Sequence, residues 1–441
     1  MKITPLHDWI GSRINHPGET FSRASLEAWQ LQRLQSVLGY AREHARFYRD
    51  LFASAPQTIH SFNDLAVFPF TTADDLRADP LRFVCLPQDE ISRIVTLPTS
   101  GTSGPSKRVF FSESDQELTV DFFKVGMSTL ARAGDRVLIL LPGVRPGSVG
   151  DLLRIGLERL GCQPVVYGPV DEEEKVLKVI LEQNCNVLVG APVHLHRLAR
   201  WDEFHHILPA GQIRALLSST DVLADTIRGN LQTLWGCEVF DHWGMTETGL
   251  GGGVECEAHH GVHLREADLY VEIIDPISGR VLPDGEMGEV VFTTLTRTAM
   301  PLIRYRTGDL SRLIPGLCPC GSFIKRLERI RQRVNSGVPL HASLLTLNDL
   351  DEALFQIKEI LDFSALFRAN SGKTELTLYL RLMDGQKFSQ IKKEVKRKVI
   401  EINPLEDWIE NGQFNLKLLT LPDPMQTSSG FMQKRVIQTN N

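Results

Sequence analysis

Between residues 136 and 244 the sequence alternates short apolar runs with segments of helical periodicity. Helical patterns occupy residues 149–161 and 171–184. Five apolar runs are typical of buried strands: "RVLILLPG" (136–143), "PVVYG" (164–168), "NVLVGAP" (186–192), "IRALLSST" (213–220) and "CEVFDHWG" (237–244). This alternation predicts a mostly parallel sheet with helices on both faces. In such sheets ligands bind at the carboxyl ends of the strands.

Other periodicities flank this region. Apolar residues at three- and four-residue spacing predict a helix over 25–48, and two runs joined by turn-forming residues predict an antiparallel β unit over 262–314. After residue 334 we expect helices over 348–362 and 386–402 and strands over 375–382 and 414–421. The predicted fold class is therefore α/β: a large N-terminal domain (1–332) with the parallel sheet and the β unit, and a small, mobile C-terminal α+β domain (333–441).

Composition narrows the function classes. The chain has 441 residues and a net charge of -6, which disfavours nucleic acid as a partner. It shows neither a secretory h-region nor an apolar run long enough to cross a membrane, so we expect a cytoplasmic protein without a membrane partner. Seven cysteines in a chain of this size do not indicate a disulfide scaffold.

The stretch "TSGTSGPSK" (99–107) has the composition of a phosphate-binding loop. Gly101 and Gly104 let backbone amides approach a ligand closely, the hydroxyl side chains donate to oxygen atoms, and Lys107 adds positive charge. The spacing is not that of a Walker loop, because that motif requires lysine directly after its second glycine. A flexible surface turn is the alternative interpretation for a stretch of this composition.

Two further segments carry candidate ligand groups. "HWGMTETG" (242–249) follows a predicted strand and places Thr246 and Glu247 in a polar turn, where the carboxylate could bind Mg²⁺. "MPLIRYRTGDL" (300–310) ends in Asp309, a carboxylate positioned to accept hydrogen bonds from ribose hydroxyls. A salt-bridged turn residue is the alternative interpretation of Asp309.

In this order the three segments resemble the adenylate-forming acyl- and aryl-CoA ligases, and most of all the phenylacetate–CoA ligase branch. The first resembles the family's Gly/Ser/Thr-rich ATP loop, and the second its aromatic-Gly-x-Thr-Glu segment. "GEVVFTTLTRTAMPLIRYRTGDL" (288–310) is similar to the branch's signature, which ends near the ribose-binding aspartate. The resemblance covers residues 90–335 well and the ends of the chain more loosely.

The resemblance implies a two-step reaction. The carboxylate of an acid, expected to be aromatic, attacks the α-phosphorus of ATP to give an acyl adenylate and pyrophosphate, and the thiol of coenzyme A then displaces AMP. Mg²⁺ on Glu247 would neutralise phosphate charge, Thr246 would contact the α-phosphate and Asp309 the ribose. Relatives are often dimers, so a homodimer is possible.

The remaining nucleotide-binding candidates surround the same motifs. We expect the adenine near residues 218–221 and 241–244, with Trp243 either stacking on it or belonging to the core. The candidates are Thr99, Ser100, Gly101, Thr102, Ser103, Gly104 and Lys107 for the phosphates, and Ser219, Asp241, His242, Trp243 and Gly244 for the rest of the nucleotide.

The C-terminal part departs from the family pattern. The family brings a lysine from its small domain into the site, and Lys434 in "TSSGFMQKRVIQ" (427–438) is the candidate, although three residues separate it from the glycine that usually precedes it directly. The branch's hinge usually has Gly-Arg followed by paired aspartates. The corresponding "RIRQRVNSGVPLHA" (329–342) has no aspartate; Arg331 is the candidate for the family's arginine and Arg333 the alternative.

Cysteines and histidines predict a structural zinc site. Cys256 and His259 form a Cys-x-x-His pair, and Cys318 and Cys320 a Cys-Pro-Cys-Gly turn, which together provide three thiolates and one imidazole. His263 is expected at the start of a strand, where it could face the nucleotide instead. Free buried cysteines are the alternative interpretation, and a disulfide between Cys256 and Cys318 is a weaker one in a reducing compartment.

The expected function is therefore AMP-forming acid–CoA ligation with ATP, Mg²⁺, coenzyme A and structural zinc. One alternative is an adenylating enzyme with another acceptor, such as a carrier protein or a deazaflavin. Another is a nucleotide-binding protein that has lost catalysis, which the missing hinge aspartates and the displaced lysine favour.

Overall fold

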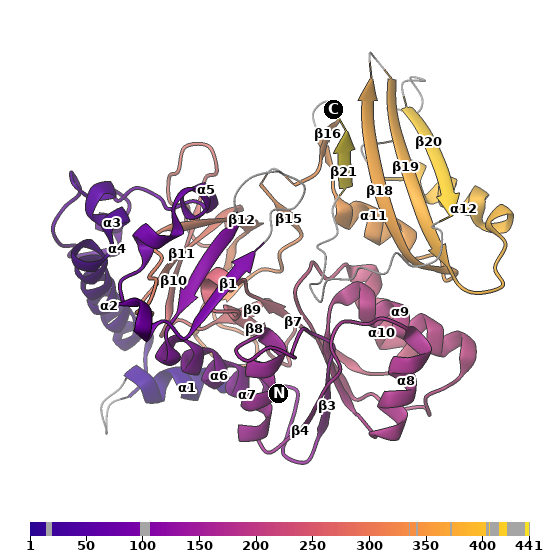
Figure 1. Cartoon of the computed structure of the whole chain (residues 1–441), viewed down its shortest axis with the longest axis horizontal. Coiled ribbons are helices and arrows are strands. Elements are labelled where there is room, and N and C mark those ends of the chain that lie inside the picture. Colours follow the sequence, from indigo (N-terminus) through magenta and orange to yellow (C-terminus); the bar gives the residue numbers. More distant parts are fainter. Residues whose placement is uncertain are drawn as a thin grey trace. The chain divides into compact units, whose positions relative to one another are not determined.

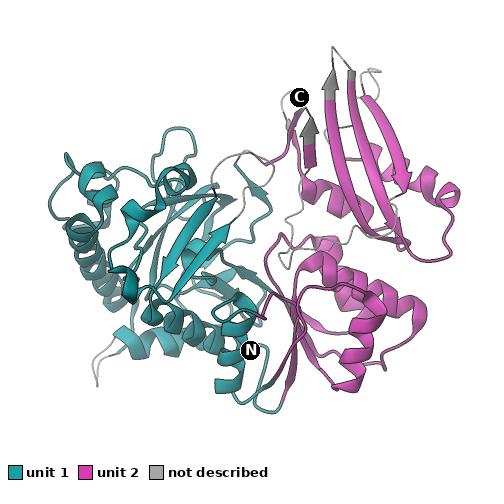
Figure 2. Ribbon diagram, in the orientation of Figure 1, with its two compact units in different colours: residues 1–134, 145–163, 240–334 teal, residues 135–144, 164–239, 335–441 magenta. Residues whose placement is uncertain are grey.

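The computed structural model describes residues 1–14, 20–97, 106–334, 336–340, 343–370, 373–402, 405, 414–420 and 437–440. The chain forms two compact units (Figure 2). Unit 1 contains residues 1–134, 145–163 and 240–334, and unit 2 contains residues 135–144, 164–239 and 335–441. The division into domains 1–332 and 333–441 stays a prediction.

Unit 1 begins with a series of helices (Figure 1). They are α1 (Pro5–Ile14), α2 (Arg23–His44), α3 (Arg46–Leu51), α4 (Phe62–Leu65) and α5 (Ala73–Ala78), followed by the 3-10 turns η1 (Pro80–Phe83) and η2 (Gln88–Glu90). The helix predicted over 25–48 is found as α2 and α3, because Ala45 takes an extended conformation (φ -99°, ψ 119°) between them.

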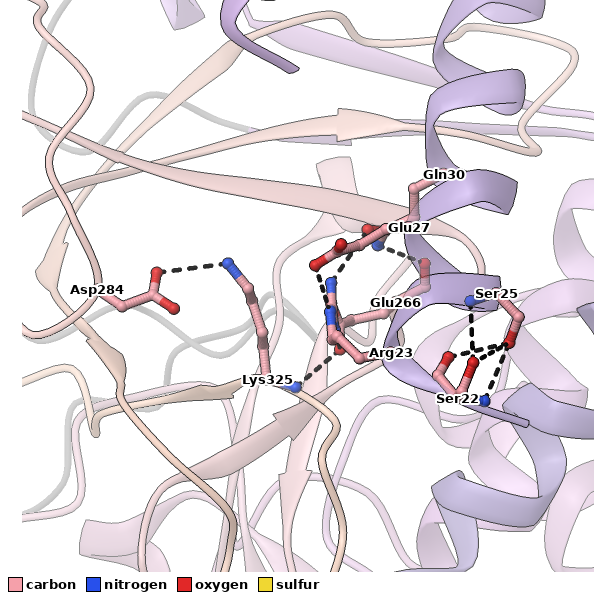
Figure 3. A network of polar contacts seen from close by, with 8 residues as sticks. All are labelled: Ser22, Arg23, Ser25, Glu27, Gln30, Glu266, Asp284 and Lys325. Carbon is pink, nitrogen blue, oxygen red and sulfur yellow. Dashed lines mark hydrogen bonds and ion pairs between the residues drawn. The ribbon is translucent and has the colours of Figure 1, made fainter. Parts of the chain in front are cut away.

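Helix α2 is anchored at its first turn (Figure 3). Ser22 and Ser25 form a reciprocal capping box that satisfies two backbone N–H groups at the helix start. Arg23 donates to both carboxylate oxygens of Glu266 at 2.8 Å, and that carboxylate also accepts from the backbone N–H of Lys325 at 2.7 Å. These bonds tie the N-terminal helices to two segments of the later β region.

The β structure of unit 1 is antiparallel. β1 (Arg93–Leu97) pairs with β2 (Lys107–Phe111), and the helices α6 (Glu113–Met127) and α7 (Val149–Arg159) follow. A second sheet has the order β10 (Leu269–Ile274), β11 (Gly288–Thr294), β12 (Tyr305–Ser311) and β15 (Gln332–Arg333). A third series runs β13 (Leu313–Ile314), β14 (Arg326–Leu327), β9 (Val262–Leu264), β8 (Gly253–Glu255) and β7 (Glu238–Trp243). The predicted antiparallel unit is confirmed.

Most of the alternating region lies in unit 2, whereas its residues 145–163 and 240–244 belong to unit 1. Its strands are ordered β6 (Ala215–Ser218), β5 (Val187–Gly190), β3 (Arg136–Ile139) and β4 (Gln163–Val166), and β3, β5 and β6 pair in parallel. The helices are α8 (Glu173–Glu182), α9 (Pro192–His205) and α10 (Asp225–Trp235). β3, β5 and β6 are buried over nearly their whole length, as expected for strands covered on both faces.

The C-terminal part of unit 2 is α+β. β16 (Val338–Leu340) pairs with β17 (Ser343–Leu345), and a sheet of order β20 (Phe414–Thr420), β19 (Lys373–Leu382), β18 (Ile360–Asn370) and β21 (Ile437–Asn440) accompanies α11 (Leu347–Leu354) and α12 (Phe388–Ile400). The helix predicted over 348–362 was wrong beyond Leu354. Residues from Ile360 onward pair antiparallel with β19, and this long-range pairing outweighs the local helical spacing.

The predicted fold class is confirmed: the chain is α/β, with antiparallel sheets in unit 1 and an α+β C-terminal part. Among the described residues no helix combines the length and the apolar character that crossing a membrane requires.

Candidate functional site

Glu247 lies in the 3-10 turn η3 (Thr246–Thr248) between β7 and β8. Its carboxylate is buried, and its Oε1 atom accepts hydrogen bonds from Lys107 Nζ and, at 2.9 Å, from Tyr305 Oη. Burial raises the pKa of Glu247, but the Lys107 ammonium, a backbone N–H and the Tyr305 hydroxyl together outweigh this effect and hold that pKa below its usual value. Glu247 is therefore a carboxylate at neutral pH, placed beside a cation.

Lys107 is the first residue of β2, directly after the Gly/Ser/Thr-rich stretch. The structure brings it to Glu247, so two of the predicted nucleotide-binding motifs meet at this ion pair. Thr99, Ser100, Gly101, Thr102, Ser103 and Gly104 lie outside the described residues, as does Lys434.

Asp309 is aimed by an irregularity of β12. The register between β11 and β12 shifts between Glu289 and Val291, and Gly308 has φ 75°, which a residue with a Cβ rarely adopts. Asp309 is buried, and both of its carboxylate oxygens have partners: Oδ2 accepts from Trp243 Nε1 at 3.1 Å, and Oδ1 pairs with Arg333 Nε at 2.8 Å.

Trp243 ends β7 and is packed in the hydrophobic core of unit 1. Of the two interpretations of this residue, the structure supports a core side chain whose indole N–H also fixes Asp309. The next residue, Gly244, permits a close approach of the chain, because a Cβ there would lie 2.8 Å from the carbonyl oxygen of Leu250.

The other predicted nucleotide-binding residues differ in their surroundings. Thr246 is half-buried at the start of η3, and Asp241 is buried in β7 with its Oδ1 accepting from the backbone N–H of His242 at 2.9 Å. Burial lowers the pKa of His242 to about 4. Ser219 belongs to unit 2, where its backbone N–H donates to Gly190, and Arg331 is exposed.

A cluster of sulfur and nitrogen ligands lies elsewhere in unit 1. Cys256, His263, Cys318 and Cys320 are all buried, and their ligand atoms lie within 4.8 Å of one another. Cys256 Sγ is 3.7 Å from Cys318 Sγ, and Cys320 Sγ is 3.5 Å from His263 Nε2. Tetrahedral zinc with Zn–S bonds of about 2.3 Å separates its sulfurs by roughly 3.8 Å, so the donor set fits this metal.

The histidine of this cluster differs from the expected one. His263 lies in β9, which pairs with β8 and so stands beside Cys256, just after β8. His259 instead has φ 47° and directs its Nδ1 to Glu255 Oε2 at 3.1 Å. Burial raises the pKa of the Cys320 thiol, but hydrogen bonds with His263, with the backbone at Ser322 and Thr4 and with Cys318 together outweigh it. They lower that pKa to about 6, which favours the thiolate.

The sequence motifs assign no role to Tyr305, which contacts Glu247. Of the two candidate arginines, Arg333 pairs with Asp309, whereas Arg331, the first candidate, is exposed. The alternation of β12 contains the missing signal: Tyr305 and Asp309 are both buried members of the strand. The neighbouring arginines are structural, because Arg304 pairs with Glu272 at 3.0 Å and Arg306 pairs with Glu289.

The sequence of this chain is similar to those of known enzymes. Residues 42–296 match the AMP-binding enzyme family. A phenylacetate–coenzyme A ligase of Pseudomonas putida is 30% identical over 81% of this chain and 82% of its own. One of Aromatoleum evansii is 34% identical over 72% of each chain.

Solved structures show the same fold. A 2-hydroxyisobutyryl-CoA ligase in the postadenylation state superposes with a TM-score of 0.80, 21% sequence identity and coverage of 96% of this chain and 94% of the other. The resemblance predicted from the motifs is confirmed. The chain belongs to the AMP-binding enzyme family, in the phenylacetate–CoA ligase-like branch of the adenylate-forming acyl- and aryl-CoA ligases.

Proposed function

We propose that this enzyme converts a carboxylic acid into its coenzyme A thioester at the expense of ATP. In the first step a carboxylate oxygen bonds to the α-phosphorus and the bond from that phosphorus to the bridging oxygen breaks, which releases pyrophosphate. In the second step the sulfur of coenzyme A bonds to the acyl carbon, the bond from that carbon to the phosphate oxygen breaks, and AMP and the thiol proton are released. The observation that carries the proposal is the meeting of Lys107, Glu247 and Tyr305 in a chain of this family.

The residues have distinct roles in this proposal. Glu247 would hold Mg²⁺, whose charge offsets that of the phosphates when it is bound. Lys107, which pairs with Glu247 in the structure, would then turn to the phosphate oxygens. Thr246 would donate to the α-phosphate and Asp309 would accept from the ribose hydroxyls.

Other parts of the proposal rest on the family. Lys434 would enter the site for adenylation and the C-terminal domain would move between the two steps. The Gly/Ser/Thr-rich stretch at 99–104 would surround the triphosphate, and Ser219, Asp241, His242, Gly244 and Arg331 would complete the nucleotide site. An aromatic acid is the proposed substrate, because the two curated relatives described above are named phenylacetate–coenzyme A ligases.

Pyrophosphate exchange into ATP with a panel of aryl and short-chain acids tests the first step. We expect exchange with at least one aromatic acid, and AMP release that depends on coenzyme A with the same acid. Exchange without such release would point to another acceptor, such as a carrier protein or a deazaflavin. No exchange with any acid would support a protein that has lost catalysis.

We also propose that Cys256, His263, Cys318 and Cys320 bind one structural Zn²⁺. Four protein ligands leave no open position for substrate, so the ion would clamp the loop that contains Cys318 and Cys320 to β8 and β9. Elemental analysis should find one zinc per chain. We expect chelator to lower the melting temperature of the wild type and Cys320→Ser to lower the zinc content, whereas Cys185→Ser, a buried cysteine of unit 2, should retain it.

A cytoplasmic location and a homodimer complete the proposal. In the structure all seven cysteines are free, which suits a reducing compartment. Sedimentation velocity would decide between monomer and dimer.

A further inference from the structure

Arg297 is a buried cation in the loop between β11 and β12 to which the proposed reaction assigns no role. Its side chain is 7% exposed, and its guanidinium carbon lies 4.2 Å from the centre of the Phe111 ring. Nη1 donates to the backbone carbonyl of Glu247 at 2.7 Å, and Nη2 donates to that of Phe110 at 3.4 Å. The ion pairs found among the described residues do not include Arg297.

Such an arrangement is costly. Burial lowers the pKa of Arg297 to about 10, so the side chain is still charged at neutral pH. The guanidinium contacts carbonyl groups and the Phe111 ring, and nearby Asp115 and Glu247 offset only part of the cost of burial. A buried charge of this kind costs more to bury than an apolar residue of similar size. The position therefore needs a reason beyond packing.

The two carbonyl groups belong to the two segments that form the candidate site. Phe110 lies in β2, the strand that begins with Lys107, and Glu247 is the central residue of η3. Arg297 thus connects the backbone behind the lysine to the backbone of the carboxylate residue.

The loop that contains Arg297 is itself held in place. Asp115, in the first turn of α6, accepts from the backbone N–H groups of Thr298 at 2.9 Å and Ala299 at 3.1 Å, and from that of Ser112 at 3.0 Å. The backbone that carries Arg297 is therefore held in place by Asp115. From this anchored backbone, the hydrogen bonds of the guanidinium can fix the positions of β2 and η3.

We infer that Arg297 is a positioning residue that fixes the Glu247 turn against β2 and so presents the Glu247 carboxylate to the divalent cation of a bound nucleotide. The inference rests on the proposed function. Loss of the guanidinium would free the Glu247 carbonyl from its donor and make the carboxylate position less defined. Loss of the guanidinium should therefore reduce the increase in ATP affinity that Mg²⁺ causes.

Calorimetry on the full-length protein tests this inference with ATP alone and with ATP plus Mg²⁺. For the wild type we expect Mg²⁺ to strengthen ATP binding. In Arg297→Met the increase in ATP affinity caused by Mg²⁺ should be about tenfold smaller than in the wild type. This is the size expected when one buried hydrogen bond from a charged donor is lost. Arg297→Lys should recover part of the gain, because its ammonium can still donate to the Glu247 carbonyl.

Arg304→Met is the matched control. Arg304 is also buried and also donates to backbone carbonyl groups, at Ala66 and Phe68, but its ion pair is with Glu272. We expect this variant to lose stability and to keep the Mg²⁺-dependent gain. If Arg297→Met does not fold, Arg297→Leu, which also has no hydrogen-bond donor, takes its place with the same expected loss.

Three results would overturn the inference. The first is an unchanged Mg²⁺-dependent gain in a folded Arg297 variant. The second is an equal loss in Arg304→Met, which would indicate a general effect of destabilisation. The third is a wild type that binds no ATP with Mg²⁺, which would overturn the proposed function as well; the first two leave that function standing.

Discussion

At the scale of single residues, the carboxylate of Asp309, the proposed acceptor for the ribose hydroxyls, is held by two neighbouring side chains. Trp243 and Arg333 occupy one oxygen each, so the side chain is fixed from two directions. A ribose that binds here would replace or share these partners. We expect the indole N–H to keep its hydrogen bond to Asp309 when ribose binds, because Trp243 is buried in the core of unit 1.

We therefore predict that Trp243→Phe weakens ATP binding while it preserves the aromatic packing. Loss of one hydrogen bond to a charged acceptor corresponds to about 1.5 kcal/mol, or roughly a tenfold higher KM for ATP with an unchanged KM for the acid. Pyrophosphate exchange at varied ATP measures both values. Trp235→Phe is the control, since Trp235 Nε1 makes a similar buried bond to Asp202, at 2.9 Å, in unit 2. Equal KM values for ATP in wild type and Trp243→Phe would contradict this role.

At the scale of secondary structure, sequence patterns predicted the strands and helices of the 136–244 region well. Buried parallel strands are short continuous apolar runs, and the Pro, Gly and polar residues at their ends are local signals. The helix predicted over 348–362 failed because Leu350, Leu354, Ile357 and Leu361 continue the helical spacing beyond the true end of α11. The pairing of β18 with β19 decides the structure there, and no local pattern contains that information.

The residues of the candidate site also fall into two groups: those that local sequence patterns indicate and those that depend on long-range pairing. The motifs made Glu247 and Asp309 candidates, and their roles stay predictions. The Cys-x-x-His and Cys-x-Cys spacings predicted that Cys256, Cys318 and Cys320 lie together, as they do in the structure. The choice between His259 and His263 depends on strand pairing, and spacing in the sequence cannot decide it. Tyr305 was not predicted for the same reason: its hydrogen bond to Glu247 joins residues 58 positions apart in the sequence.

The bulge in β12 leads to a prediction for Gly308. We expect Gly308→Ala to destabilise the protein by about 1–2 kcal/mol, because alanine at φ 75° is strained, and to raise the KM for ATP, because Asp309 is the next residue. Gly39→Ala, in the middle of α2 with no heavy atom within 4 Å of the added Cβ, should instead stabilise the protein by up to about 1 kcal/mol. Thermal unfolding and exchange kinetics measure the two effects. A Gly308→Ala variant with wild-type melting temperature would show that the strand relaxes around the change.

At the scale of the whole molecule, unit 2 contains a buried charge network that joins its two parts. Glu173 in α8 accepts from Arg197 in α9 at 2.6 Å and from both terminal nitrogens of Arg381 in β19, at 2.9 and 2.8 Å. Glu173 is 2% exposed, so the carboxylate is removed from water and depends on these partners. The network links the parallel-sheet region to the C-terminal α+β part of the same unit.

We predict that Glu173→Gln lowers the free energy of unfolding by about 3 kcal/mol at pH 7, because two guanidinium groups lose their counter-charge. Burial raises the pKa of Glu173, but Arg197 and Arg381 together outweigh it and hold that pKa below the usual value. A depressed carboxyl pKa contributes stability that is fully present above the unfolded-state pKa, about 4.3, and is lost as the pH falls through the folded-state value. The urea midpoints of wild type and variant should therefore differ most at neutral pH and draw together as the pH falls from about 4.3 through the lower folded-state pKa. Glu174→Gln is the control. It changes the residue next to Glu173 and removes only an exposed ion pair with Lys178, so it should leave the midpoint nearly unchanged at every pH. A Glu173→Gln midpoint that stayed equally low at acidic pH would attribute the loss to packing, because the charge contribution disappears there.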